Sequence, residues 1–160
     1  GKIRWYGISS IRPNVIEAYV RRSNIVSVMM QYSLLDHRPE EAMLNLLHRH
    51  GISVIVRGAV AQGLLAGKPP VPYLQYTDGE VARAAKTVAK IAEANKWSLL
   101  EVALGYVRAH PAVATVALGI RTSAQLDEAV QALHHPPTLS DTDYAALRQA
   151  VRTFRYEQHR

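Results

Sequence analysis

The sequence predicts an α/β fold in which helices pack on a parallel sheet. Short, nearly unbroken apolar runs alternate with longer segments whose apolar residues recur every three or four positions. Unbroken apolar runs are typical of strands covered on both faces, and the longer spacing is typical of helices that cover them. The chain has 160 residues, which suits one domain with its own core. We therefore expect a single domain over residues 1–160.

Four apolar runs are the expected strands of this sheet, namely residues 3–8, 26–31, 52–57 and 113–118. The last run ends at Gly119. Thr122 and Gln125, three residues apart, then form a capping-box pair that opens a helix.

The chain begins on Gly1, almost directly in a strand, which is typical of an excised or processed piece.

Proline, glycine and capping residues indicate where the helices begin and end. Pro13 and Pro39 each suit the first turn of a helix, and Gly51 suits the position just after one. Ser98 with Glu101 makes a second capping box. The later helices are expected over residues 80–95, 98–110, 122–133 and 140–158.

A long connection separates the third strand from the following helix. It runs from about residue 58 to 79 and contains Pro69, Pro70 and Pro72. This length exceeds that of an ordinary connection between elements. We therefore expect a functional or lid-like role for it.

Two architectures fit this order of elements: a doubly wound sheet and half of a (β/α)8 barrel. A complete barrel needs about 250 residues, so four strand–helix units in this length cannot close one. In both architectures the ligand site lies at the carboxyl ends of the strands. Hydroxyl, amide and guanidinium groups follow those ends, among them Ser9, Gln31, Arg57 and Arg121, with almost no carboxylates. This set suits an anionic, amide-bearing ligand better than acid–base hydrolysis.

Arg121 lies at the expected start of a helix. A helix N-terminus attracts anions, and a guanidinium matches phosphate or carboxylate. Two interpretations are open at this point: a phosphate site, or a surface arginine beside a helix cap.

The charge and composition of the chain exclude some classes of partner and location. The net charge is +6, but the basic residues are scattered rather than gathered in one stripe, so we expect no nucleic-acid partner. There is no cysteine, which agrees with a reducing compartment. No apolar run approaches the roughly 20 residues that a membrane helix needs. We expect a cytoplasmic protein without a membrane partner.

Four ordered blocks of the sequence resemble the second half of the aldo-keto reductases. Residues 1–10 (GKIRWYGISS) are similar to the fifth strand of that family, and residues 31–36 (QYSLLD) to its sixth. Residues 61–68 (AQGLLAGK) resemble the segment after strand seven, and residues 118–126 (LGIRTSAQL) the segment around strand eight. The resemblance implies the C-terminal half of a TIM barrel in an oxidoreductase that uses NADP(H) to reduce aldehydes or ketones.

The resemblance also assigns roles along a nicotinamide dinucleotide. Ser9 and Gln31 match residues that hold the nicotinamide carboxamide, and Ser10 stands where the family usually has Asn. Arg57 matches the position where many members stack a tyrosine under the nicotinamide ring. The matches to the loop over the pyrophosphate are Gly58, Val60, Gly63, Leu64 and Leu65. The matches to the adenosine end are Arg121, Thr122, Gln125 and Glu128, with Arg121 and Thr122 on the 2′-phosphate and Gln125 and Glu128 towards adenine. Gly119, in the same block, is a further expected cofactor-binding residue.

The catalytic Asp, Tyr, Lys and His of the family belong to strand–helix units that would precede Gly1. The chain alone is therefore expected to be inactive, and a small carbonyl substrate would bind only with the missing half. The tyrosines of the chain are interpreted as packing or surface aromatics, and no metal-ligand spacing occurs.

An open half-barrel has unpaired strand edges. We also expect its uncovered face to be filled by Ile, Val and Met, which predicts a homo-oligomer or a complementing half-barrel as partner. Two other functions are left open: a non-catalytic nucleotide-binding or regulatory module of the same superfamily, and an interaction protein with a basic surface.

Overall fold

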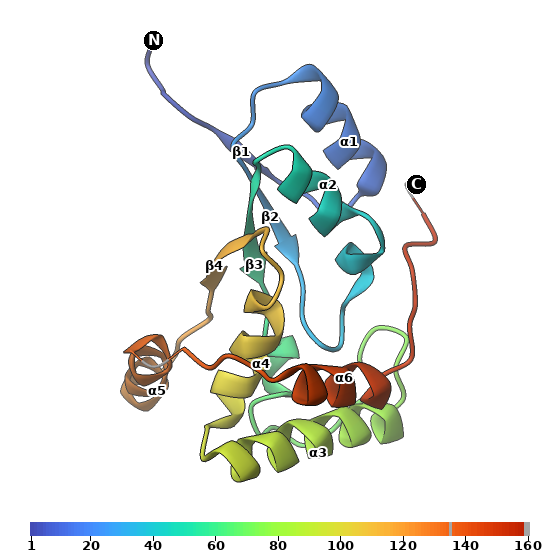
Figure 1. Ribbon diagram of the computed structural model, residues 1–160, viewed down its shortest axis with the longest axis vertical. Coiled ribbons are helices and arrows are strands. Elements are labelled where there is room, and N and C mark those ends of the chain that lie inside the picture. Colours follow the sequence, from blue (N-terminus) through green and yellow to red (C-terminus); the bar gives the residue numbers. More distant parts are fainter. Residues whose placement is uncertain (135, 159–160) are drawn as a thin grey trace.

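A four-stranded parallel sheet forms the centre of the molecule (Figure 1). The structure is a computed structural model that describes residues 1–134 and 136–158. The strands, which pair in chain order, are β1 (Gly7–Ser9), β2 (Ser27–Gln31), β3 (Ser53–Arg57) and β4 (Val113–Ala117). A doubly wound sheet reverses its strand order at one point. The consecutive order therefore favours barrel-type winding over the doubly wound alternative.

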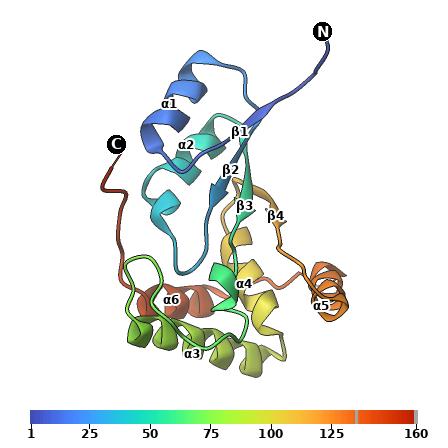
Figure 2. The same cartoon turned by 180° about the vertical axis from the view of Figure 1, so that it is seen from behind.

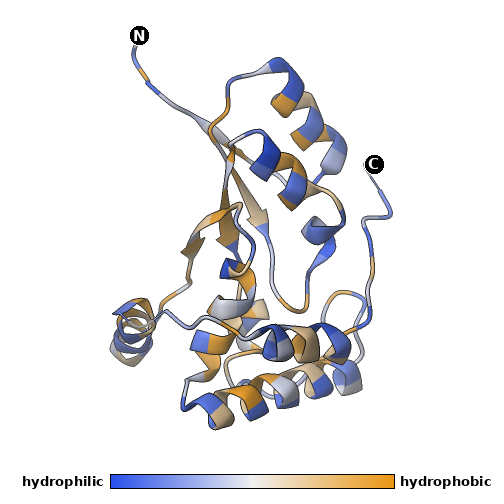
Figure 3. Ribbon diagram, viewed as in Figure 1, coloured by the Kyte–Doolittle hydropathy of each residue, from blue (hydrophilic) through white to orange (hydrophobic). Residues whose placement is uncertain are grey.

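The two faces of the sheet differ in burial. Val28, Met30, Val54 and Val56 alternate along the two central strands and are fully buried. Successive strand residues point to opposite faces, so these four side chains share the face that the helices cover. The residues between them are half-buried or exposed. Figure 3 shows the apolar residues concentrated on the strands, with hydrophilic residues spread over the helices.

The uncovered face is more polar than the sequence predicted. Met29 and Ile55 lie side by side on it, and Thr115 of β4 continues the same row. The row on the amino-terminal side pairs Ser27 with Ser53. The expected surface of Ile, Val and Met is present only in part, because the alternation of side chains leaves Met29 and Ile55 on the uncovered face but gives most of those residues to the covered face.

The helices surround the covered face and the carboxyl ends of the strands. They are α1 (Pro13–Arg22), α2 (Met43–Arg49), α3 (Asp78–Asn95), α4 (Leu99–Arg108), α5 (Ser123–His134) and α6 (Asp141–Ala150), with 3-10 turns η1 (Arg38–Glu41) and η2 (Ala61–Gly63). Helices α1 and α2 lie on one side of the sheet, and α3 and α6 pack side by side (Figures 1 and 2). Helix α5 projects away from the rest of the molecule in both views.

Several predicted boundaries are confirmed. Pro13 is the first residue of α1, and Ser98 and Glu101 form the predicted capping box at the start of α4. The first strand is shorter than predicted, because residues 3–6 are exposed and pairing with β2 begins only at Gly7. Pro39 opens a 3-10 turn, and the α-helix begins at Met43.

The last helix ends at Ala150 rather than continuing to Gln158. Val151 has an extended backbone, and the chain continues without helix as a C-terminal segment, residues 151–158. Val151, Phe154 and Tyr156 are buried there. The apolar pattern of a helix continues in the sequence past residue 150. The chain leaves the helix there because an irregular course buries these three side chains.

Candidate functional site

The carboxyl ends of the three first strands bring polar side chains to one edge of the sheet. Ser9 ends β1, Gln31 ends β2 and Arg57 ends β3. Gln31 and Arg57 are direct register partners. The sequence predicted this grouping because the carboxyl ends of parallel strands share an edge.

Gln31 is held from both sides. Arg57 Nη1 donates a hydrogen bond to Gln31 Oε1 over 3.0 Å, and Gln31 Nε2 donates to the hydroxyl of Tyr73 over 3.0 Å. A guanidinium has donors only, so the atom of Gln31 that faces Arg57 is the oxygen. These two contacts fix the orientation of the amide.

A groove of about 550 Å³ lies beside this cluster, and Ser9, Ser10, Arg12, Tyr19 and Arg57 are among the residues that line it. The Ser10 hydroxyl accepts a hydrogen bond from the Arg12 N–H over 3.1 Å, so it shapes the turn into α1. The Ser9 side chain is exposed, and its hydroxyl makes no hydrogen bond to another described residue. The structure thus places Ser9, Ser10 and Arg57 around one open space.

The connection after β3 forms a tight loop. Gly58 and Gly63 have φ values of +72° and +96°, which favour glycine. A Cβ on Gly63 would come within 2.8 Å of Lys68 Cδ, so the side chain of Lys68 closes over this glycine. Lys68 was not among the site residues predicted from the sequence.

Leu64 and Leu65 in the same loop are buried in the core. Their N–H groups donate to the carbonyl oxygens of Ala61 and Val60, and the Gly63 N–H also donates to Val60. In this conformation Gly63, Leu64 and Leu65 shape the loop rather than present donors to a ligand.

The segment between β4 and α5 carries the second cluster of predicted residues. The Gln125 N–H donates to Thr122 Oγ1 over 3.2 Å, and the Arg121 N–H donates to Gln125 Oε1 over 2.8 Å. The predicted Thr122–Gln125 pair therefore caps the helix, although the glutamine reaches Arg121 instead of Thr122. Gly119 is exposed, and Glu128 on α5 is half-buried.

The Arg121 guanidinium makes no hydrogen bond or ion pair within residues 1–134 and 136–158. Its backbone is fixed by Gln125 while its side chain is exposed. This arrangement leaves the whole donor set of the guanidinium available to an anion.

The two clusters lie along the same edge of the sheet. Gln31, Arg57 and Ala117 form one row across the strands, and Arg121 follows Ala117 by four residues. The structure brings Ser9, Gln31 and Arg57 together, and Arg121, Thr122 and Gln125 together. It leaves them as two separate clusters.

Tyr73 is a further residue of the site that the sequence did not indicate. It was interpreted as a packing or surface aromatic, yet its hydroxyl contacts Gln31, 42 residues away in the chain. No sequence pattern near Tyr73 predicts this contact. Burial, together with the charge of Asp36, raises the pKa of Tyr73, so its hydroxyl keeps its proton at neutral pH.

Other tyrosines do have the packing role that was predicted. The hydroxyls of Tyr32 and Tyr106 donate to Glu40 Oε1 over 2.9 and 2.5 Å, and burial raises the pKa of both phenols. Arg148 of α6 completes the cluster with a 3.4 Å ion pair to Glu40. These contacts join η1, α4 and α6.

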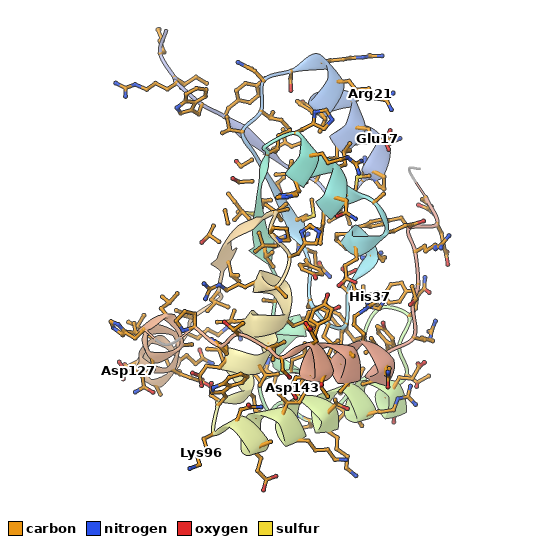
Figure 4. The ribbon with its side chains drawn as sticks, in the orientation of Figure 1. Glu17, Arg21, His37, Lys96, Asp127 and Asp143 are labelled. Atoms are coloured by element: carbon orange, nitrogen blue, oxygen red, sulfur yellow. The ribbon has the colours of Figure 1, made fainter. Side chains whose placement is uncertain are left out.

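The titratable side chains of the described residues offer no metal centre. Among the described residues there is no group of three or more His, Cys, Asp or Glu that could hold an ion. In Figure 4 the labelled Glu17, Arg21 and Lys96 lie at the periphery, whereas His37 is 2% exposed. None of the described helices is long and apolar enough to cross a membrane.

Comparison with known proteins gives a consistent result. The model of the aldo/keto reductase family matches residues 1–152. The chain is 45% identical over 169 aligned residues to the uncharacterized oxidoreductase YqkF of Bacillus subtilis, covering 100% of this chain and 54% of that protein. It is 25% identical over 153 residues to Protein tas of Escherichia coli, covering 84% and 44%.

Solved structures agree with this similarity. Aldo-keto reductase AKR11C1 from Bacillus halodurans, in its holo form, matches with a TM-score of 0.88 at 44% identity and covers 99% of this chain and 54% of that one. The glycerol dehydrogenase AKR11B4 from Gluconobacter oxydans, at 21% identity and a TM-score of 0.78, shares the fold. The chain spans about half the length of the relatives that it matches.

Proposed function

This chain belongs to the aldo/keto reductase family, and we propose that it is the NADP(H)-binding, C-terminal half of a (β/α)8 oxidoreductase that reduces aldehydes or ketones. In this proposal residues 1–160 form one partial domain with strands five to eight of the barrel. The observation that carries it is the placement of two polar clusters along one carboxyl edge of a consecutively ordered parallel sheet.

The first cluster suits the nicotinamide end of the cofactor. A carboxamide both donates and accepts hydrogen bonds. Gln31 keeps one Nε2 proton and one Oε1 lone pair beyond its bonds to Tyr73 and Arg57. Ser9 and Ser10 add hydroxyl groups at the same groove. Arg57 lies where its guanidinium plane can stack on the nicotinamide ring.

The second cluster suits the adenosine end. The unpaired guanidinium of Arg121 and the hydroxyl of Thr122 lie at the start of α5, where a helix N-terminus favours an anion. We assign the 2′-phosphate of NADP(H) to these two groups and the adenine to Gln125 and Glu128. Gly58, Val60 and the loop of Gly63 to Leu65 would lie over the pyrophosphate between the clusters.

Catalysis in this proposal needs a second set of residues that the chain does not supply. The polar side chains that line the proposed cofactor groove or lie beside it are mainly hydroxyl, amide and guanidinium groups, which would bind and orient the cofactor. The hydride comes from NADPH itself when it is bound. We expect no carbonyl reduction by the chain alone.

We also propose that the chain associates with a complementing half-barrel or with its own copies. Strands β1 and β4 each pair on one side only within the described sheet. A largely apolar groove of about 340 Å³ lies between β4 and α5, where Leu126, Val130 and Leu133 are exposed. A stable monomer in light scattering at micromolar concentration would contradict this association.

The cofactor assignment is tested by titrating the chain with NADPH and NADH. We expect tighter binding of NADPH, and a loss of about 10- to 100-fold in its affinity in Arg121→Ala, because a charged hydrogen bond to the 2′-phosphate is removed. NADH should be affected much less. Arg49→Ala at the end of α2 makes the same change of charge away from the site and serves as the control. Equal affinities of the unmodified chain for the two cofactors would refute the 2′-phosphate assignment.

A further inference from the structure

The connection between η2 and α3 ends in a tight turn at residues 73–76. Tyr73 and Tyr76 exchange backbone hydrogen bonds of 3.1 and 2.9 Å, and Leu74 between them has a φ of +52°. The turn sends these two tyrosines in different directions. Tyr76 is buried in the core, whereas Tyr73 is half-buried and reaches Gln31.

The C-terminal segment holds the far side of this turn. The Tyr76 hydroxyl donates to the carbonyl oxygen of Arg152 over 2.8 Å, and Gln75 Nε2 donates to Glu157 Oε1 over 3.1 Å. Arg152 in turn donates to the carbonyl oxygen of Gln75. The C-terminal segment runs beside the connection in both views (Figures 1 and 2). The position of Tyr73 is therefore fixed by residues outside the cofactor groove.

The contact between Tyr73 and Gln31 constrains an amide that has two possible orientations. Arg57 supplies donors only, so it selects the orientation that turns Oε1 toward itself. Gln31 Nε2 then faces the Tyr73 oxygen, which accepts its proton. The phenolic proton of Tyr73 is not used in this contact and remains available as a donor. Tyr73 and Arg57 together leave one donor and one acceptor of Gln31 open.

We propose that Tyr73 is a positioning residue for the cofactor, which holds the Gln31 amide in the orientation that receives the nicotinamide carboxamide. This inference rests on the proposed function, because it assigns the carboxamide to Gln31. Without the Tyr73 hydroxyl, the amide keeps only its contact with Arg57 and rotates more freely. Ordering the amide when the cofactor binds then costs free energy and lowers the affinity. In the native chain the amide is already ordered before the cofactor binds.

The test compares two ligands that differ only at the nicotinamide end. NADPH carries the carboxamide, and 2′-phospho-ADP-ribose keeps the adenosine and pyrophosphate but has no nicotinamide. In the full chain we expect Tyr73→Phe to weaken NADPH about three- to tenfold, as for the loss of one neutral hydrogen bond. Binding of 2′-phospho-ADP-ribose should stay within about twofold of the unmodified chain.

Tyr76→Phe is the matched control, because it removes a hydroxyl from the same turn without touching Gln31. It should change the affinities for both ligands by the same factor. In the double variant Gln31→Ala/Tyr73→Phe, NADPH should bind no more weakly than in Gln31→Ala alone, since the hydroxyl acts through Gln31. A general loosening of the turn would not give this pattern.

The outcomes separate the two proposals. If Gln31→Ala weakens NADPH and Tyr73→Phe does not, or if Tyr73→Phe weakens both ligands equally, the positioning role is overturned while the cofactor site stands. If the unmodified chain binds neither ligand, the proposed function fails and the positioning role fails with it. Circular dichroism at increasing temperature checks that the phenylalanine variants are folded.

Discussion

The two clusters of the candidate site are built in different ways. The cluster at β1 to β3 rests mainly on the central strands β2 and β3, whose other face is fully buried, and its Gln31 is tied to a residue 42 positions away. The cluster at β4 and α5 rests on the last strand of the sheet and on a helix whose buried residues are only Ala129 and Ala132. Its hydrogen bonds join residues three or four positions apart.

The first cluster is therefore ordered by the core, and the second is ordered by the local capping of a helix. Fixed donors cost little to organise when a ligand arrives, whereas a locally capped segment with few buried contacts opens more easily. Under the proposed assignment, we infer that the cluster at the nicotinamide end is preorganised and that the cluster at the adenosine end gains order from the ligand or from a partner chain.

The largest expected effect is a cavity made beneath the first cluster. Met30 precedes Gln31 and is 1% exposed, so Met30→Ala should lower the free energy of unfolding by about 2–5 kcal/mol. Leu126 on α5 is 50% exposed, and Leu126→Ala should change it by no more than about 0.5 kcal/mol. Urea denaturation measures both. Equal losses would place α5 in the same cooperative core as the central strands.

A smaller effect is expected from removing helix caps. Ser98 caps α4 through the Glu101 N–H at 3.1 Å, and α4 is almost entirely buried. Ser98→Ala should therefore lower the global stability by about 1 kcal/mol.

Thr122→Ala removes the matching contact from α5. Its effect should be local: faster amide exchange within α5 and an unchanged urea midpoint. A shift of the urea midpoint as large as that of Ser98→Ala would break the distinction between the two regions.

The smallest expected change in the free energy of unfolding is the one caused by acidification. Burial, and then the nearby charge of Arg148, lowers the pKa of His37, which is 2% exposed. Below the ordinary histidine pKa of about 6.5 the unfolded chain binds the proton more readily than the folded chain. The free energy of unfolding should therefore fall between pH 7.5 and 5.5.

His37→Gln removes this titration, and its stability should fall less over the same interval. Burial also lowers the pKa of His110, so part of the pH dependence should persist in the variant. Urea midpoints at both pH values measure the difference. An equal fall in the variant and the unmodified chain would exclude His37 as a source.

The two clusters also differ in how much of them could be predicted from the sequence. The Thr122–Gln125 cap and the Ser98–Glu101 box were predicted because their residues are neighbours on one helical turn. The grouping of Gln31 and Arg57 at one edge was predicted because alternating strands and helices make a parallel sheet, although the order of the strands was left open between two architectures.

Tyr73 and the course of the C-terminal segment could not be predicted in this way. Both depend on contacts between distant parts of the chain, such as Tyr73 with Gln31 and Tyr76 with Arg152. The polarity of the uncovered sheet face was also misjudged, because the prediction used the overall composition of the runs and not the alternation that gives Ser27, Met29 and Gln31 to that face.

The central claim is that one dinucleotide spans both clusters, and it is tested most directly by mapping NADPH onto the backbone amides of the labelled chain by NMR. We expect shifts on binding at Ser9, Gln31 and Arg57 and also at Arg121, Thr122 and Gln125, with the larger gain of protection from exchange in the second group. Shifts confined to one cluster, or located away from the carboxyl edge of the sheet, would contradict the account.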